Sequence, residues 1–481
     1  MERSPLQRKL RETHGPTEKL DAAACRPQSL YWGKAFEQNR ENPKTRSMDQ
    51  NKSKVNGVEL FAWRALPFAV TANIIVFLIY YGLSLHLFMS EDMVDWIYAA
   101  LTTETAMSEI FQPHNGQRIP FTKSLAALSV AFFQARPGFI LFVSATALST
   151  TIALIVQAAR RSQPSRSLAN LATAIALILA LRTYTLFAWV HPTYVQYSLA
   201  VLFFCLALQA AIRSALKSKG SGVYWVAALL LASCSTYSSG QGILVWPALG
   251  WLSFRYRVGP ARILLLAAAF GTTAFFYFNG NGLESQQLQS TPSIDKLLLT
   301  IHYLGQPWVK VDALYPIGFL TALIVAGAAF WVLVVYGLRT PRPGPHDAFL
   351  LSVIGFGVAS AILTGLTRAS EGTLAVTRYG LFVGLTEAAL APFALKALQP
   401  YWRSSKVRKV CLLAGLSVIV LLVTEQIAVG LRVVQKAQVV DHAAQEIRAG
   451  NTDPELLRTL HPRPDSFRRT LEEARRQRLS P

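Results

Sequence analysis

Apolar runs of about 20 residues recur along the middle of the chain, separated by short polar segments. At 1.5 Å per residue, a helix of this length crosses the hydrocarbon core of a bilayer, which is about 30 Å thick. The pattern predicts an all-α, polytopic helical membrane protein with about 11 transmembrane helices. The fifth and sixth runs are short, so a re-entrant pair is an alternative for them. The predicted spans are 66–89, 138–158, 168–190, 194–212, 223–237, 242–254, 261–279, 314–337, 347–367, 379–396 and 410–430.

Polar sequence lies on both sides of this transmembrane helical domain, which covers residues 65–431. Residues 1–64 carry both charge signs and no apolar periodicity, which predicts a disordered cytoplasmic tail. Residues 432–481 contain helical segments near 434–449 and 466–478, separated by Asp-Pro and His-Pro-Arg-Pro breaks. We expect them to form a small extracytoplasmic C-terminal helical tail.

Charge is distributed unequally between alternate loops. If the N-terminus is inside, the five inner loops hold 16 Lys and Arg residues, against seven in the outer segments. Cytoplasmic loops are enriched in Lys and Arg, so the N-terminus is expected to be cytoplasmic and the C-terminus extracytoplasmic. The inner loops are 159–167, 213–222, 255–262, 338–346 and 396–409.

Composition excludes several classes of protein. Hydrophobic residues make up 52% of the chain and charged residues 15%, where soluble domains carry about 25%. This excludes a soluble enzyme and a disordered chain. The net charge of +20 reflects the basic inner loops and anionic membrane lipids. No nucleic-acid-binding module is recognisable, so no nucleic acid is expected as a partner.

Two outer segments are long, 90–137 and 280–313. Long loops are uncommon unless they are functional. Within them, 121–134 and 294–304 are apolar but too short to span a bilayer. Both are expected to be interfacial helices that lie along the outer surface of the membrane.

Carboxylates cluster just after the first span, at Glu91, Asp92 and Asp95. Such a cluster at a membrane surface can act as a general base, a metal ligand or a cation site. The alternative is a solvated helix N-terminus, where acidic residues complement the helix dipole. The sequence identifies no cofactor. A divalent metal could bind here, but no metal-ligand spacing indicates one.

Two groups of cations on the outer side suit a phosphate, which guanidinium and imidazolium groups bind well. His114 and Arg118 lie in FQPHNGQRIPF, immediately before the first interfacial helix. An ordinary lipid-headgroup anchor is the alternative. Arg368 and Arg378 bracket a short outer loop, and a salt bridge to Glu371 or to an acid of the first outer segment is the alternative there.

Other polar and aromatic residues are less specific. An aromatic belt at the outer membrane edge is expected for Tyr184, Trp189, His191, Tyr194 and Tyr197. Glu387 and Glu425 lie within predicted spans, where a carboxylate is either functional or caps a neighbouring helix.

Several motifs, taken in order, resemble bacterial multi-spanning proteins of the C-type (GT-C) glycosyltransferase kind. PHNGQRI (113–119) is similar to their PHNEHRI-like motif, with Gln117 in place of a His. GILVWP (242–247), YLGQPW (303–308), Arg368 with TRY (377–379), and LLRTLHPRP (456–464) match further elements. The resemblance covers nearly the whole chain beyond the N-terminal tail.

This resemblance implies transfer of a sugar from a polyprenyl-phosphate donor on the outer face of a bacterial inner (plasma) membrane. It implies Asp92 as the catalytic base, with Asp95 as second choice. Arg368, Arg378 and Tyr379 would then bind the donor phosphate. His114 and Arg118 would act on the donor or the acceptor. The partners implied are the lipid-linked sugar donor and membrane lipids, and the oligomeric state is not specified.

The competing class is a transporter or flippase of lipid-linked saccharide, which needs the cations but no outer carboxylate. An O-antigen polymerase-like or acyl-transfer enzyme is a third reading. Polar groups crowd the outer side instead of extending through the membrane, and this favours the glycosyltransferase.

Overall fold

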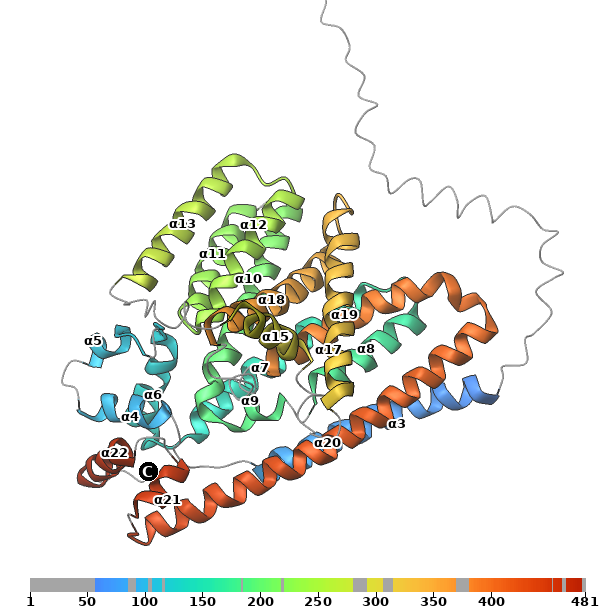
Figure 1. Ribbon diagram of the computed structural model, residues 1–481. Coiled ribbons are helices and arrows are strands. Elements are labelled where there is room, and N and C mark those ends of the chain that lie inside the picture. The colour runs from blue at the N-terminus through green and yellow to red at the C-terminus, as the bar shows by residue number, and fades with distance from the viewer. Residues whose placement is uncertain are drawn as a thin grey trace, which may run out of the picture. The chain divides into compact units, whose positions relative to one another are not determined.

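The computed structural model (Figure 1) describes residues 57–84, 92–102, 106–114, 117–182, 185–217, 220–279, 292–305, 315–368, 380–451, 453–460 and 464–477. The chain divides into two compact units, Met1–Leu60 and Phe61–Pro481. All helices considered below lie in the second unit, apart from the first residues of α3 (Gly57–Ser84). Residues 1–56, most of the predicted N-terminal tail, lie outside the described residues.

The regular elements in the described part of the chain are helices, which confirms the all-α prediction. The first half contains α4 (Asp92–Thr102), α5 (Ala106–Phe111), α6 (Pro120–Phe133), α7 (Gly138–Arg161), α8 (Arg166–Ala180), α9 (Leu186–Val190), η4 (Pro192–Tyr194), α10 (Val195–Leu216) and α11 (Ser221–Thr236). The second half contains η5 (Gly240–Leu244), α12 (Val245–Arg255), α13 (Pro260–Phe278), α15 (Ser293–Leu304), α17 (Tyr315–Val332), η7 (Leu333–Leu338), α18 (Pro345–Arg368), α19 (Gly380–Leu398), η9 (Gln399–Arg403), α20 (Ser405–Arg448), α21 (Pro454–Leu460) and α22 (Pro464–Arg476).

Seven helices in the described ranges are long and apolar enough to cross a membrane, and α6, α8 and α11 are shorter apolar helices. The protein is therefore a polytopic membrane protein, as the sequence predicts. The predicted span 168–190 differs from the structure, because the chain breaks after Ala180 and only a short helix, α9, follows. The predicted span 410–430 lies within α20, which continues without a proline for 44 residues, past the expected start of the C-terminal tail at residue 432.

The main core forms around α10, which packs against α7, α11, α12 and α18 (Figure 1). Small side chains at Ala200, Ala207 and Ala211 are buried there, so neighbouring backbones can approach closely. Large apolar side chains on the outside of the bundle, such as Leu264 and Phe330, are exposed. Exposed side chains of this kind suit contact with lipid chains.

A second core joins the first long loop to the C-terminal tail. Buried side chains of α4, α6 and the start of α7 pack with those of α21, α22 and the end of α20. Gln477 Nε2 donates to the Leu101 carbonyl at 2.9 Å, which ties the end of α22 to α4. The tail and the first long loop therefore lie at the same end of the bundle, which we call the Asp92 end.

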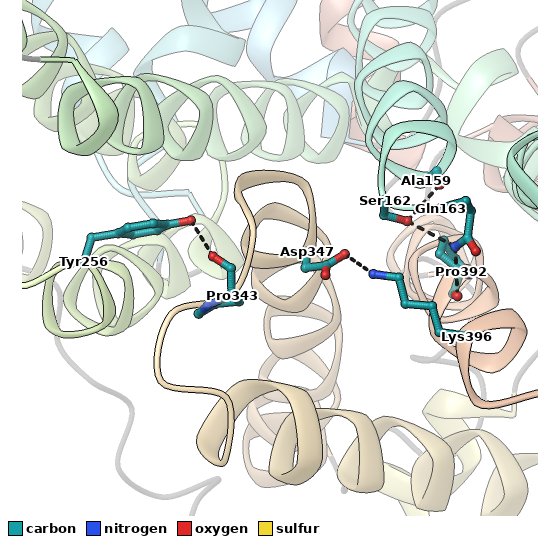
Figure 2. A network of polar contacts seen from close by, with 8 residues as sticks. All are labelled: Ala159, Ser162, Gln163, Tyr256, Pro343, Asp347, Pro392 and Lys396. Atoms are coloured by element: carbon teal, nitrogen blue, oxygen red, sulfur yellow. Dashed lines mark hydrogen bonds and ion pairs between the residues drawn. The ribbon is translucent and has the colours of Figure 1, made fainter. Parts of the chain in front are cut away.

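The five loops predicted to be inner meet one another at the opposite end, which we call the basic end. Tyr256 donates to the Pro343 carbonyl at 3.1 Å, Asp347 pairs with Lys396 at 2.5 Å, and Gln163 donates to the Pro392 carbonyl at 3.0 Å (Figure 2). Further hydrogen bonds join Arg262 to Ser214 and Ser221, and Arg255 to the Gly337 carbonyl. The loops that share a charge bias in sequence are thus also neighbours in space.

Candidate functional site at the Asp92 end

Asp92 is the first residue of α4, and its carboxylate lies beside His114. The distance from Asp92 Oδ1 to His114 Nε2 is 3.5 Å, with 35% of the Asp92 side chain and 16% of the His114 side chain exposed. The next side chains of α4, Met93 and Val94, are buried in the second core and fix the start of the helix. A half-exposed carboxylate is thus held on a rigid element.

His114 is held by its own loop as well as by Asp92. Its backbone pairs with that of Gln117 through two hydrogen bonds of 2.7 and 2.9 Å. Its ring meets the ring of buried Trp96 edge to face, with 5.6 Å between centroids. The pairing of His114 with Gln117 therefore brings the two sides of a turn together and presents the imidazole to α4.

Arg118 follows this turn and is anchored by carbonyl groups. Its guanidinium donates to the Phe111 carbonyl at 2.7 Å and to the Asn279 carbonyl at the end of α13. Its buried Nε has no hydrogen-bond partner among the described residues. The carbonyl partners orient the guanidinium, and no ion pair with a carboxylate joins it within the described ranges, so it is suited to an anionic ligand.

Gln117, which stands where the resembling proteins have a His, links this turn to the segment just before GILVWP (242–247). Its Oε1 accepts a 3.0 Å hydrogen bond from the Gly240 N–H, at the start of η5. The close packing of η5 also requires glycine at 242, because a Cβ there would lie 1.9 Å from the Ser235 carbonyl oxygen. The PHNGQRI motif thus contacts the chain two residues before the GILVWP motif.

Lys123, in the first turns of α6, ties that helix to the preceding loop. Its Nζ donates to the carbonyls of Glu109 and Gln112 at 3.0 and 2.8 Å. Burial lowers its pKa; nearby Glu109 opposes this shift and Arg118 adds to it. Phe132 and other apolar side chains on the far face of α6 are exposed. An interfacial position along the membrane, as predicted for 121–134, remains an expectation that these exposed side chains fit.

Of the other predicted site residues, the structure describes the side chain of Asp95 alone. Asp95 lies one turn after Asp92 on α4 and is half-buried. Arg368 is the last residue of α18, but its side chain lies outside the described residues, as do Arg378 and Tyr379. The structure therefore brings Asp92, His114 and Arg118 into one region. The phosphate-binding role of the 369–379 loop stays a prediction.

A buried ion pair inside the bundle was missed by the sequence reasoning. Arg182, in the break between α8 and α9, donates from Nη1 to Glu387 Oε2 at 2.5 Å. The side chains are 1% and 7% exposed. A lone arginine within the apolar run 168–190 was the available signal, because an intramembrane cation needs a partner.

The predicted aromatic belt is wrong for the four residues that the structure describes. Trp189, His191, Tyr194 and Tyr197 are all buried in the protein. Trp189, Tyr194 and Tyr197 belong to the main core. The His191 and Tyr194 rings stack there with 5.0 Å between centroids. Tyr184 lies outside the described residues.

The described residues contain no group of three or more His, Cys, Asp and Glu residues that could hold a metal ion. Asp92 and His114 alone would be too few ligands for a structural metal. The described side chains at this end include a carboxylate, an imidazole and an anchored guanidinium.

Comparisons with known proteins leave the family open. No family model matches the chain, and no curated protein matches it. One solved structure to which the chain is similar is the archaeal oligosaccharyltransferase AglB from Archaeoglobus fulgidus, in complex with an inhibitory peptide and a dolichol-phosphate. The identity is 14%, the TM-score is 0.38, and the match covers 80% of this chain. It covers 59% of the AglB chain, so this chain spans about three fifths of that protein's length.

Proposed function

We propose that the protein is an integral membrane glycosyltransferase that transfers a sugar from a polyprenyl-phosphate donor at the Asp92 end. The observation that carries the proposal is the approach of Asp92 to His114, 3.5 Å apart, with Arg118 anchored four residues further along the same loop. A base and a cation close together suit group transfer from a phosphate.

In the proposed reaction, Asp92 removes the proton from the acceptor hydroxyl while the hydroxyl oxygen attacks the anomeric carbon of the donor sugar. The bond from that carbon to the phosphate oxygen breaks, and polyprenyl phosphate leaves as the anion. His114, when protonated, stabilises the ionised Asp92 carboxylate. Asp95 is the second candidate for the base.

The leaving phosphate requires positive charge that is fixed before the reaction. Arg118 is the described residue suited to this role, and we assign Arg368, Arg378 and Tyr379 to the same task. Arginine stays protonated, so these groups act electrostatically and by hydrogen bonding.

We further propose that the Asp92 end is extracytoplasmic and the basic end cytoplasmic, in a bacterial inner membrane. The gathering of the Lys- and Arg-rich loops at one end supports this orientation. The C-terminal tail would then be extracytoplasmic, because it packs on α4, and the N-terminal tail cytoplasmic.

A transporter or flippase of lipid-linked saccharide is the second candidate. The observation in its favour is the Arg182–Glu387 pair, since buried charges inside a bundle often mark a substrate path.

Reconstitution separates the two functions. The full chain in liposomes is incubated with a panel of polyprenyl-phosphate sugars and candidate acceptors, and the release of polyprenyl phosphate is measured. We expect turnover by the wild-type protein and its loss in Asp92→Asn. The matched control is Asp465→Asn, which alters an acid on α22 with 86% of its side chain exposed. Full turnover in Asp92→Asn, or donor translocation without sugar release, would contradict the transferase.

A further inference from the structure

A pocket with a cavity volume of about 420 Å³ lies at the basic end, far along α10 and α13 from the Asp92 site. It is formed by Ala215 near the end of α10 and by residues 256–262, which include the turn between α12 and α13. Two arginines, Arg257 and Arg262, line it together with Tyr256. None of these residues takes part in the proposed transfer reaction.

Two of the cations in this region, Arg262 and Lys217, are held in place by neutral partners. Arg262 donates to the hydroxyls of Ser214 and Ser221 at 3.3 and 2.7 Å. Lys217 donates to the Tyr224 hydroxyl at 3.3 Å. No ion pair with a carboxylate joins Arg257, Arg262 or Lys217 in the part of the chain that the structure describes. Their charge is therefore available to an anion.

The sequence around the pocket lacks any carboxylate that could neutralise it. Residues 110–283 contain 13 Lys and Arg residues and not one Asp or Glu. Asp347, at the same end of the bundle, is already paired with Lys396 at 2.5 Å (Figure 2). An uncompensated group of cations at a membrane surface attracts anionic headgroups.

Apolar side chains lead away from the pocket along the helices. Ile263 and Leu264, in the first turns of α13, are 46% and 71% exposed, and Leu216 and Val223 are 57% and 75% exposed on α10 and α11. A free phosphate ion would not contact this apolar surface. A ligand with an anionic head and long apolar chains would contact both the cationic pocket and the apolar side chains beside it.

We propose that this pocket binds the headgroup of an anionic phospholipid, with its phosphate on Arg257 and Arg262 and its acyl chains along α13. Arginine suits this role because its planar fork donates two hydrogen bonds to phosphate. The position at the start of α13, a 19-residue helix, adds the favourable end of the helix dipole. The bound lipid would join α10, α12 and α13 at the membrane surface.

Retention of lipid by the full chain tests the site. The protein is incorporated into nanodiscs of phosphatidylcholine containing a minor fraction of phosphatidylglycerol, released, and analysed by native mass spectrometry. We expect one phosphatidylglycerol molecule to stay bound to the wild-type protein. Arg257→Asn should lower that occupancy about tenfold, the change expected when one charge-assisted hydrogen bond is lost. Arg257 has a φ of 51°, which asparagine tolerates well, so the turn should be kept.

A matched variant distinguishes a pocket from general attraction. Arg342 is also exposed at the basic end but does not line the pocket, so Arg342→Asn should retain the lipid as the wild type does. Equal loss in both variants would overturn the proposal, as would unchanged retention in Arg257→Asn. A third experiment tests inorganic phosphate as the ligand by its effect on the unfolding temperature of the protein. If phosphate alone raises the unfolding temperature in pure phosphatidylcholine as much as phosphatidylglycerol does, the ligand is a free anion and the lipid proposal is wrong.

Discussion

Arg182 and Glu387 meet inside the helical bundle although 205 positions separate them in sequence, with Nη1 and Oε2 2.5 Å apart. Arg182 sits where α8 ends, and its carbonyl accepts a hydrogen bond from the Thr185 hydroxyl at 2.7 Å. Glu387 lies two turns into α19, and Thr185 packs against Gly384 of the same helix. The ion pair therefore holds the break in the chain against α19.

Removing one partner of this pair should be strongly destabilising. Glu387→Leu removes the carboxylate partner of a buried guanidinium, and we expect a loss of about 3–5 kcal/mol in the free energy of unfolding. The double variant Arg182→Met with Glu387→Leu should recover most of this loss, because both charges of the pair are then removed. Unfolding in detergent, followed by tryptophan fluorescence, measures the stability of the single and the double variant.

The control variant is Asp347→Asn, which breaks the pair with Lys396. The Asp347 side chain is 25% exposed and that of Lys396 16%, so this loss should cost less free energy of unfolding. A single variant as stable as the wild type would contradict the assigned role.

Replacement of Gly242 by alanine should disrupt η5. The new Cβ would lie 1.9 Å from a backbone oxygen that cannot move without unwinding α11, and we expect a cost of about 3 kcal/mol. Gly250→Ala, on α12, is the control, because no atom lies within 4 Å of its Cβ position. That substitution should be neutral or slightly stabilising. Similar unfolding temperatures for the two variants would show that the contact is not tight.

Mild acid should loosen α15. Burial lowers the pKa of His302 below its ordinary value of 6.5. Between that lowered value and 6.5 the unfolded segment binds a proton that the folded one does not, so stability falls as the pH falls through this window. Hydrogen exchange over residues 293–304 at pH 7.5 and pH 5.5 measures the effect. In His302→Phe the pH dependence should disappear, while His442→Phe, on an exposed face of α20, should keep it.

Thiol labelling checks the orientation. Arg342→Cys places an exposed thiol at the basic end, and Asn451→Cys places one in the C-terminal tail, just after α20. In intact cells we expect an impermeant maleimide to label position 451 and to reach position 342 only after lysis. Labelling of position 342 from outside would reverse the proposed topology.

The donor-binding role of Arg378 is tested by kinetics. If it holds the donor phosphate, Arg378→Ala should raise KM for the donor about tenfold or more, the loss expected for a charge-assisted hydrogen bond. Arg378→Lys should restore binding only partly, since lysine lacks the bidentate fork. An unchanged KM in Arg378→Ala would place the phosphate elsewhere.

Hydropathy located the long helices because their apolar runs end at charged residues. The prediction of 138–158 corresponds to α7, and that of 347–367 to α18, within a few residues. It failed at 168–190, because the average apolar content continues through the break near Arg182. The break is stabilised by Glu387, which lies in another helix. The sequence near Arg182 therefore does not reveal that the helix ends there.

The site was predictable only where its parts are close in sequence. Asp92 and His114 belong to one outer segment, so their approach could be expected. The bond from Gly240 to Gln117 joins positions 123 residues apart, and it depends on how α11 and α12 pack. A hydropathy profile contains no information on that packing.

The uninterrupted course of α20 has a mechanical consequence. Its 44 residues form a rod about 66 Å long, roughly twice the thickness of a hydrocarbon core. One end of this rod begins beside the basic loops, and the other carries Val440 and Ile447 into the core shared with α4. Since the rod has no proline at which to bend, a small tilt in the membrane becomes a larger displacement at its far end. A bilayer thinner than the apolar stretch of a helix favours a larger tilt, so bilayer thickness is expected to influence the position of the helix that bears Asp92.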